Sequence, residues 1–264
     1  VSTGTLSAAE ARLSEQGIHV LAMEADARKE SDWERVASAA LDKFGAIHAV
    51  MNNAGVGGGG SSGPIEEQSA EDWRWTIDVN LMGVVFGVKT MVPHIKEAGG
   101  GWILNVASMA GMNGFPYGGA YNATKLAVAG LSEGWAMELA PSGIQVATLC
   151  PGFVKTRIYL SDRVRPSDYD ASHRELIMSD EDLDQETMSV GISNEVKNGI
   201  DADVLAARVI ESLRAGDLYI FTHPSFRSGV GERYAMIDRC FESAERSPIV
   251  GAVTSSVSDP DVFK

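Results

Sequence analysis

The stretch Gly118-Gly119-Ala120-Tyr121-Asn122-Ala123-Thr124-Lys125 is the one around which the rest of the chain is arranged. Residues four apart stack on one face of a helix, so the Tyr121 phenol and the Lys125 ammonium would lie side by side. A free phenol, with a pKa of about 10, is a poor acid-base catalyst at neutral pH. A nearby cation favours the phenolate and lowers that pKa. Taken alone, the pair could equally be two residues that share a helical face by chance.

Length, charge and cysteine content set the class of protein. The chain has 264 residues, a formal net charge of −14 and two cysteines, Cys150 and Cys240. The length fits one α/β domain over residues 1–264. The negative charge disfavours nucleic acid and anionic membranes as partners, and two distant cysteines indicate reduced thiols. Because no apolar run reaches the length of a membrane span and no signal-peptide pattern is present, we expect a soluble cytoplasmic protein.

Short apolar runs alternate with helical patterns through most of the chain, which is typical of a parallel sheet covered by helices. The expected strands are residues 18–23, 47–51, 102–106, 144–150 and 218–221. The expected helices are residues 6–16, 31–44, 71–94, 120–139, 203–214 and 226–245.

Two segments interrupt this pattern. Residues 57–63 form a glycine-serine loop, and residues 157–198 are polar and include an acidic cluster between Asp180 and Glu186. A stretch as long as the second is usually a functional lid or is disordered.

A hydrolase is the alternative that one short motif suggests. Gly130-Leu131-Ser132-Glu133-Gly134 matches the Gly-x-Ser-x-Gly pattern of α/β-hydrolases. That motif requires a strand immediately before it, and here it falls inside the helix expected over residues 120–139. We therefore set the hydrolase interpretation aside.

The remaining motifs form one ordered set. They are Asn52-Asn53-Ala54-Gly55 after a strand, Asn80 in the long helix, Ser108 after a strand, the Tyr121/Lys125 pair and Pro151-Gly152. Each alone could be a turn or cap residue. Together, in this order and spacing, they resemble the short-chain dehydrogenase/reductase family along nearly the whole chain. The resemblance implies a Rossmann-like α/β fold, a doubly wound parallel sheet, and NAD(P)-dependent oxidation or reduction of a lipophilic secondary alcohol or ketone.

The resemblance implies a catalytic set of Asn80, Ser108, Tyr121 and Lys125, without a metal. Hydride transfer from an alcohol needs a group that removes the hydroxyl proton, and Tyr121 would do so. Ser108 would hold the substrate oxygen, and Lys125 would lower the pKa of the phenol and bind the nicotinamide ribose. Asn80 would distort its helix and hold a water that links Lys125 to solvent. The plainer alternatives are a strand-terminal hydroxyl for Ser108 and a helix-kink residue for Asn80.

The cofactor contacts implied in the same way follow the strand ends. Asp26 would bind adenine, although a turn residue between strand and helix is an equal alternative. The full set is Asp26, Asn53, Ala54, Gly55, Tyr121, Lys125, Pro151, Gly152, Val154 and Thr156. The cofactor would be NAD or NADP, with a slight preference for NAD.

One family feature is missing from the sequence. The family begins with a strand, a Gly-rich turn that binds the pyrophosphate, a helix and a second strand. No such turn follows Thr3-Gly4, and by comparison with the family roughly three dozen residues of a βαβ unit are absent. The expectation is therefore a fragment of a longer protein, or a chain that folds poorly and binds cofactor weakly. The alternative function is a non-catalytic fragment that retains only the oligomerisation surface.

The last expectations concern partners and substrate. Two long apolar helices, residues 73–91 and 120–139, predict a homodimer or homotetramer with a helical-bundle interface, as the family resemblance implies. The segment 157–198 lies where the family places its substrate lid, and its length suggests a bulky substrate. Arg163-Val164-Arg165-Pro166, Leu218-Tyr219-Ile220 and His223-Pro224 resemble, less specifically, bacterial enzymes that oxidise benzylic alcohols of lignin-derived aryl ethers.

Overall fold

The computed structural model describes residues 3–57, 64–169 and 188–251. The chain divides into two compact units, residues 1–222 and 223–264. The first unit contains all the candidate site residues. That residues 1–264 form a single domain stays a prediction.

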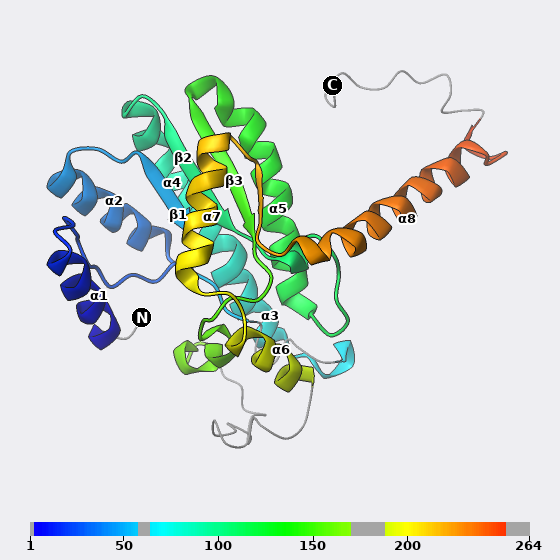
Figure 1. The fold of residues 1–264 in the computed structure, drawn as a ribbon, viewed down its shortest axis with the longest axis horizontal. Coiled ribbons are helices and arrows are strands. Elements are labelled where there is room, and N and C mark those ends of the chain that lie inside the picture. The colour runs from blue at the N-terminus through cyan, green and yellow to red at the C-terminus, as the bar shows by residue number, and fades with distance from the viewer. Residues whose placement is uncertain (1–2, 58–63, 170–187, 252–264) are drawn as a thin grey trace. The chain divides into compact units, whose positions relative to one another are not determined.

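A parallel four-stranded sheet forms the centre of the first unit (Figure 1). Its strands are β1 (Ala49–Asn52), β2 (Gly101–Val106), β3 (Ile144–Cys150) and β4 (Tyr219–Phe221), and they lie side by side in that order. Because all four run in the same direction, their carboxyl ends meet at one edge of the sheet. The predicted α/β class with a Rossmann-like parallel sheet is confirmed.

Helices cover both faces of this sheet, as a doubly wound fold requires. On one face, α7 (Ala202–Ala215) contributes Val209 to a core with residues of β2, β3 and β4. That core consists of Leu104, Ala147, Leu149, Val209 and Ile220. On the opposite face lie α4 (Gly83–Glu97) and α5 (Gly119–Leu139), where Asn105 of β2 donates a hydrogen bond to Ser132 of α5. Figure 1 shows α7 crossing in front of the strands.

The long helix expected over residues 71–94 consists of three parts. Ser69 caps α3 (Ala70–Ile77), and a π-helical turn η3 (Asp78–Met82) and α4 follow it. The combined stretch, residues 70–97, is long and apolar enough to cross a membrane, contrary to the expectation that no run reaches that length. A single such helix is weak evidence for a span, because the core helix of a soluble protein passes the same test of length and composition.

The predicted strand at residues 18–23 is wrong. This segment, between α1 (Thr3–Glu15) and α2 (Glu30–Phe44), is irregular, and Ile18 is 48% exposed. A strand needs a neighbour to pair its backbone groups. In the described part of the sheet β1 pairs only with β2, so no strand is in register beside residues 18–23.

The segment after β3 is partly described. It contains the 3-10 helix η6 (Ile158–Val164) and α6 (Met188–Lys197). The middle of the predicted lid, including the acidic cluster Asp180–Glu186, lies outside the described residues, as do residues 58–63 of the glycine-serine loop. The second unit contains the short η8 (Pro224–Phe226) and the predicted closing helix, α8 (Arg227–Glu245).

Candidate active site

Tyr121 and Lys125 lie one turn apart at the beginning of α5, on the same face. The Lys125 Nζ is 5.7 Å from the centroid of the Tyr121 ring. Lys125 is buried, with 3% of its surface exposed, and its Nζ donates a 2.7 Å hydrogen bond to the backbone oxygen of Val106, the last residue of β2. An ammonium has three N–H donors, so this bond fixes the group and leaves it able to make others.

Burial dominates the titration of this pair. It raises the pKa of the Tyr121 phenol, and a hydrogen bond with the Ser108 side chain acts in the opposite direction. It also lowers the pKa of Lys125 to about 8. We expected Lys125 to lower the pKa of Tyr121, and in this structure burial outweighs any such effect. The Lys125 ammonium lies over the face of the Tyr121 ring and donates its hydrogen bond to the backbone oxygen of Val106.

Ser108 follows β2 and caps a short 3-10 helix, η4 (Met109–Gly111). Its Oγ accepts a 3.1 Å hydrogen bond from the backbone N–H of Ala110 and is also bonded to Tyr121. The plain capping alternative is therefore observed, and Ser108 also lies beside the phenol, whereas its role toward a substrate oxygen stays a prediction. Gly111 lets η4 approach α5, since a Cβ at that position would lie 2.5 Å from the backbone oxygen of Lys125. Sequence reasoning missed Gly111.

Asn80 lies at the centre of the π-helical turn and is fully buried. Its Oδ1 accepts from the N–H of Val56 at 2.8 Å, and its Nδ2 donates to the Val56 backbone oxygen at 2.9 Å. Short π-helical segments inside α-helices occur frequently at functional sites. The distortion expected at Asn80 is thus observed, whereas its role toward a water stays a prediction.

Gly55 brings the end of β1 against these groups. A Cβ at Gly55 would lie 3.5 Å from Asn80 Oδ1 and 3.7 Å from Lys125 Nζ. The preceding Asn53 and Ala54 are exposed at the carboxyl edge of the sheet. The structure therefore brings Gly55, Asn80 and Lys125 together, from three elements far apart in the sequence.

A series of buried polar side chains, hydrogen-bonded to one another, supports this edge of the sheet, and the sequence analysis did not predict it. Asn52 donates to Asn105 Oδ1 at 2.7 Å, and Asn105 donates to Ser132 Oγ at 3.0 Å. Ser132 is the serine of the Gly-x-Ser-x-Gly motif. It is fully buried in α5 and donates to the Val128 backbone oxygen, as a structural residue would.

Asp26 is held by a neighbour that the sequence did not point to. Arg28 binds both carboxylate oxygens of Asp26, at distances between 2.6 and 3.1 Å, and this lowers the pKa of Asp26. Arg28 also lies over the ring of Tyr169, whose hydroxyl donates to Asp78 at 2.5 Å. Asp78 begins the π-helical turn. The candidate adenine contact is therefore connected through Arg28 and Tyr169 to the turn that holds Asn80.

The other residues predicted to contact the cofactor lie directly after β3. The Pro151 backbone oxygen accepts from Met109, and the Gly152 N–H donates to Thr222 Oγ1 at 3.2 Å. Val154 is buried and bridges to Ile200, while Thr156 is exposed.

Two contacts fasten the described start of the lid segment to the rest of the site. The Gly57 N–H, after β1, donates to Ser161 Oγ of η6 at 2.8 Å. Arg165 forms a buried ion pair with Asp72 of α3 and lies 4.9 Å from the centroid of the Trp75 ring. The beginning of this segment is thus fixed against α3.

The low pKa of Lys125 gives a prediction about stability. Between pH 8 and about 10.5 the unfolded chain holds a proton that folded Lys125 has lost, so stability should rise with pH there. Lys125→Met removes this titration. From pH 7.5 to 10.5, the wild-type free energy of unfolding should rise relative to the variant, by at most about 3 kcal/mol. Urea unfolding at a series of pH values measures this difference in the free energy of unfolding. Lys155→Met, at an exposed ion pair with Asp201, is the control, and a constant difference for Lys125→Met would contradict the prediction.

The residues present fit the nicotinamide half of an NAD(P) molecule. The hydroxyls of Ser108 and Tyr121 and the ammonium of Lys125 are gathered at the carboxyl edge of the sheet, and Gly55 allows close approach there. This edge is where ligands bind in open α/β sheets.

Known proteins resemble this chain in sequence and in fold. A family model described as short chain dehydrogenase matches residues 2–164. A CLA biosynthesis dehydrogenase/reductase from Lactiplantibacillus plantarum is 32% identical over 84% of this chain and 77% of its own length. A C alpha-dehydrogenase from a Sphingobium species is 30% identical over 86% of this chain and 72% of its own length.

Two further matches concern a shorter region and a solved structure. A 3-alpha-(or 20-beta)-hydroxysteroid dehydrogenase from Mycobacterium bovis is 40% identical, over 54% of this chain and 57% of its own length. The crystal structure of a short chain dehydrogenase/reductase from Burkholderia phymatum in complex with NAD matches with a TM-score of 0.82 and 31% identity. It covers 98% of this chain and 86% of that one.

Proposed function

Because this chain belongs to the short-chain dehydrogenase family, we propose that it transfers a hydride between NAD(P) and a lipophilic secondary alcohol or ketone, with Tyr121 as acid-base. Family membership supports an NAD(P)-dependent alcohol dehydrogenase in general, and the residue roles and the substrate class are our proposal. The observation that carries it is the grouping of Ser108, Tyr121 and buried Lys125 within one partly buried corner of the sheet edge.

The mechanism assigns a separate task to each side chain. Tyr121 takes the hydroxyl proton of the alcohol, or returns it to the ketone. Ser108, already bonded to Tyr121, holds the substrate oxygen where charge develops. Lys125 would hold the nicotinamide ribose, and its positive charge would favour the phenolate form of Tyr121. Asn80 fastens Val56 and so positions the loop that begins at Gly55.

The cofactor would lie along the carboxyl ends of β1 to β3. NAD or NADP, when bound, accepts or supplies the hydride. Asn53, Ala54 and Gly55 would line one side, and Pro151, Gly152, Val154 and Thr156 the other. Asp26 would meet the adenine while held by Arg28, which reduces its freedom to turn toward other partners.

The length of the segment after β3, residues 157–198, favours a bulky substrate. Its described start is fixed by Arg165 to Asp72 and contacts the loop after β1 through Ser161. The substrate would bind between Ser108, Tyr121, this loop and the lid of residues 157–198. The names of a hydroxysteroid dehydrogenase and a C alpha-dehydrogenase among the relatives favour the same class.

A substrate panel tests this proposal. With NAD and NADP, the full-length protein should turn over aryl carbinols and cyclic ketones with a kcat/KM at least about tenfold above that for sugars or short hydroxy acids, because an apolar pocket discriminates by about that factor. The measurement is absorbance of the reduced cofactor under initial-rate conditions. Preference for the small polar compounds would refute the substrate class and leave the hydride transfer intact.

We also propose that the protein is a homodimer or homotetramer in the cytoplasm. The exposed apolar side chains of α5, Leu126 at 48% and Met137 at 73%, support an interface on that helix. The free thiols of Cys150 and Cys240 fit a reducing compartment.

A further inference from the structure

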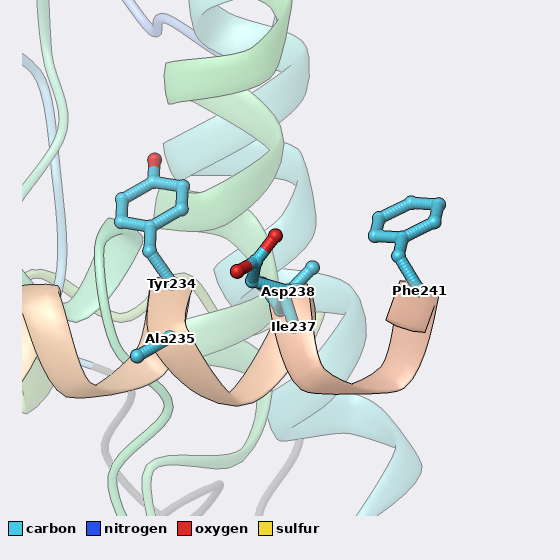
Figure 2. Close-up of a pocket in the computed structure, with 5 residues that line it drawn as sticks. All are labelled: Tyr234, Ala235, Ile237, Asp238 and Phe241. Atoms are coloured by element: carbon cyan, nitrogen blue, oxygen red, sulfur yellow. The ribbon is translucent and has the colours of Figure 1, made fainter. Parts of the chain in front are cut away.

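Helix α8, Arg227–Glu245, exposes large apolar side chains that neither the candidate active site nor its mechanism uses. None of its residues is buried, and Tyr234 and Phe241 are 54% and 66% exposed. Figure 2 shows Tyr234, Asp238 and Phe241 projecting from one side of the helix, where with Ala235 and Ile237 they line a shallow hollow. An apolar surface of this kind on a soluble chain usually marks an interaction site.

The apolar residues of α8 follow the spacing of a helix-helix seam. Successive members are four, three, four and three residues apart, as at the core positions of a coiled coil. They are Val230, Tyr234, Ile237, Phe241 and Ala244, which we name the α8 stripe. The stripe spans two heptads, too few to pair as an isolated peptide. It can contribute within a larger assembly, where the helices are held at high effective concentration.

The charges beside the stripe identify its partner as a second copy of this chain. Arg233 precedes Tyr234 and Asp238 follows Ile237, so they occupy the two flanking positions of the seam. In a parallel pair of helices, residues five apart at these positions face each other across the seam, and Arg233 would meet Asp238 of the second copy twice by symmetry.

The charge balance of α8 also suits self-association. The whole chain has a formal net charge of −14, so most of its surface repels a second copy. Helix α8 has three arginines and four acidic residues and is nearly neutral. Two copies can therefore approach along this helix with little like-charge repulsion.

We propose that α8 is an intersubunit arm, whose stripe packs in parallel against the α8 of a second copy. This contact is separate from the interface proposed on α5, and it does not depend on the catalytic function. A protein with both interfaces would form a tetramer, and loss of the α8 contact alone would leave a dimer.

Sedimentation equilibrium of the full-length protein tests the arm. Ile237→Asp puts a charge in the seam, and the molar mass should fall by half. Met236→Asp is the matched control, because Met236 is 53% exposed on the same helix but lies off the stripe, and its mass should not change. Circular dichroism checks that both variants keep their helix content. An unchanged mass for the folded Ile237→Asp variant, or a monomeric wild type at all concentrations, would overturn the proposal.

Charge reversal tests the pairing itself. Arg233→Glu and Asp238→Arg should each weaken association about fivefold, and the double variant should restore it. Residues five apart do not face each other within one helix, so rescue requires the contact between copies. A double variant no better than either single one would overturn the parallel arrangement.

Discussion

Replacing Tyr121 with Phe is expected to lower turnover about 10²- to 10⁴-fold, the usual contribution of a positioned acid-base group. The substitution removes one oxygen and its hydrogen bond with Ser108, and it leaves the ring beside Lys125. Cofactor affinity and thermal stability should therefore change little. Steady-state kinetics with an aryl carbinol and saturating cofactor measures the effect on the full-length protein.

The matched control for this experiment lies four residues earlier. Tyr117 is 53% exposed in the loop before α5, and Tyr117→Phe should leave turnover near the wild-type value. Near-normal turnover in Tyr121→Phe would rule out the phenol as the acid-base group.

Replacing Asn80 with Ala is expected to lower the free energy of unfolding by about 3 kcal/mol. Both the N–H and the backbone oxygen of buried Val56 would lose their partner, and each buried polar group left unpaired costs about 1–3 kcal/mol. Because Val56 follows the Asn53-Ala54-Gly55 stretch, activity should fall as well. Urea unfolding with a check of two-state behaviour gives the first quantity.

The same substitution at an exposed asparagine separates this effect from a general one. Asn198 donates one hydrogen bond to Asn194 at the end of α6, and Asn198→Ala should cost less than about 1 kcal/mol. If Asn80→Ala lowered the free energy of unfolding by less than about 1 kcal/mol, the hydrogen bonds between Asn80 and Val56 would not be what holds the turn.

The sequence predicted those parts of the fold that depend on local patterns. The four strands and the helix with Tyr121 and Lys125 follow from apolar runs and helical spacing, and the parallel sheet follows from their alternation. The relative positions of Asn80, Ser108, Tyr121 and Lys125 could be anticipated only through the family resemblance. What the structure adds is the contacts of these residues, such as Asn80 with Val56.

Other features could not be predicted because they depend on tertiary neighbours. An apolar run such as residues 18–23 becomes a strand only when another strand pairs with it. The ion pair of Arg165 with Asp72, 93 residues away, leaves no pattern in one sequence. In this structure burial raises the pKa of Tyr121, an effect that spacing alone does not reveal, and the lowering of that pKa by Lys125 stays a prediction.

Transfer of deuterium tests the central claim of hydride transfer most directly. The full-length protein would be incubated with an aryl carbinol deuterated at the carbinol carbon, together with NAD or NADP, and the reduced cofactor analysed by mass spectrometry. The account predicts one deuterium in the reduced nicotinamide for each ketone formed, and near-complete loss of both products in Tyr121→Phe over the same incubation. Ketone formed without deuterium in the cofactor, or no binding of either cofactor, would contradict the account and favour a non-catalytic scaffold.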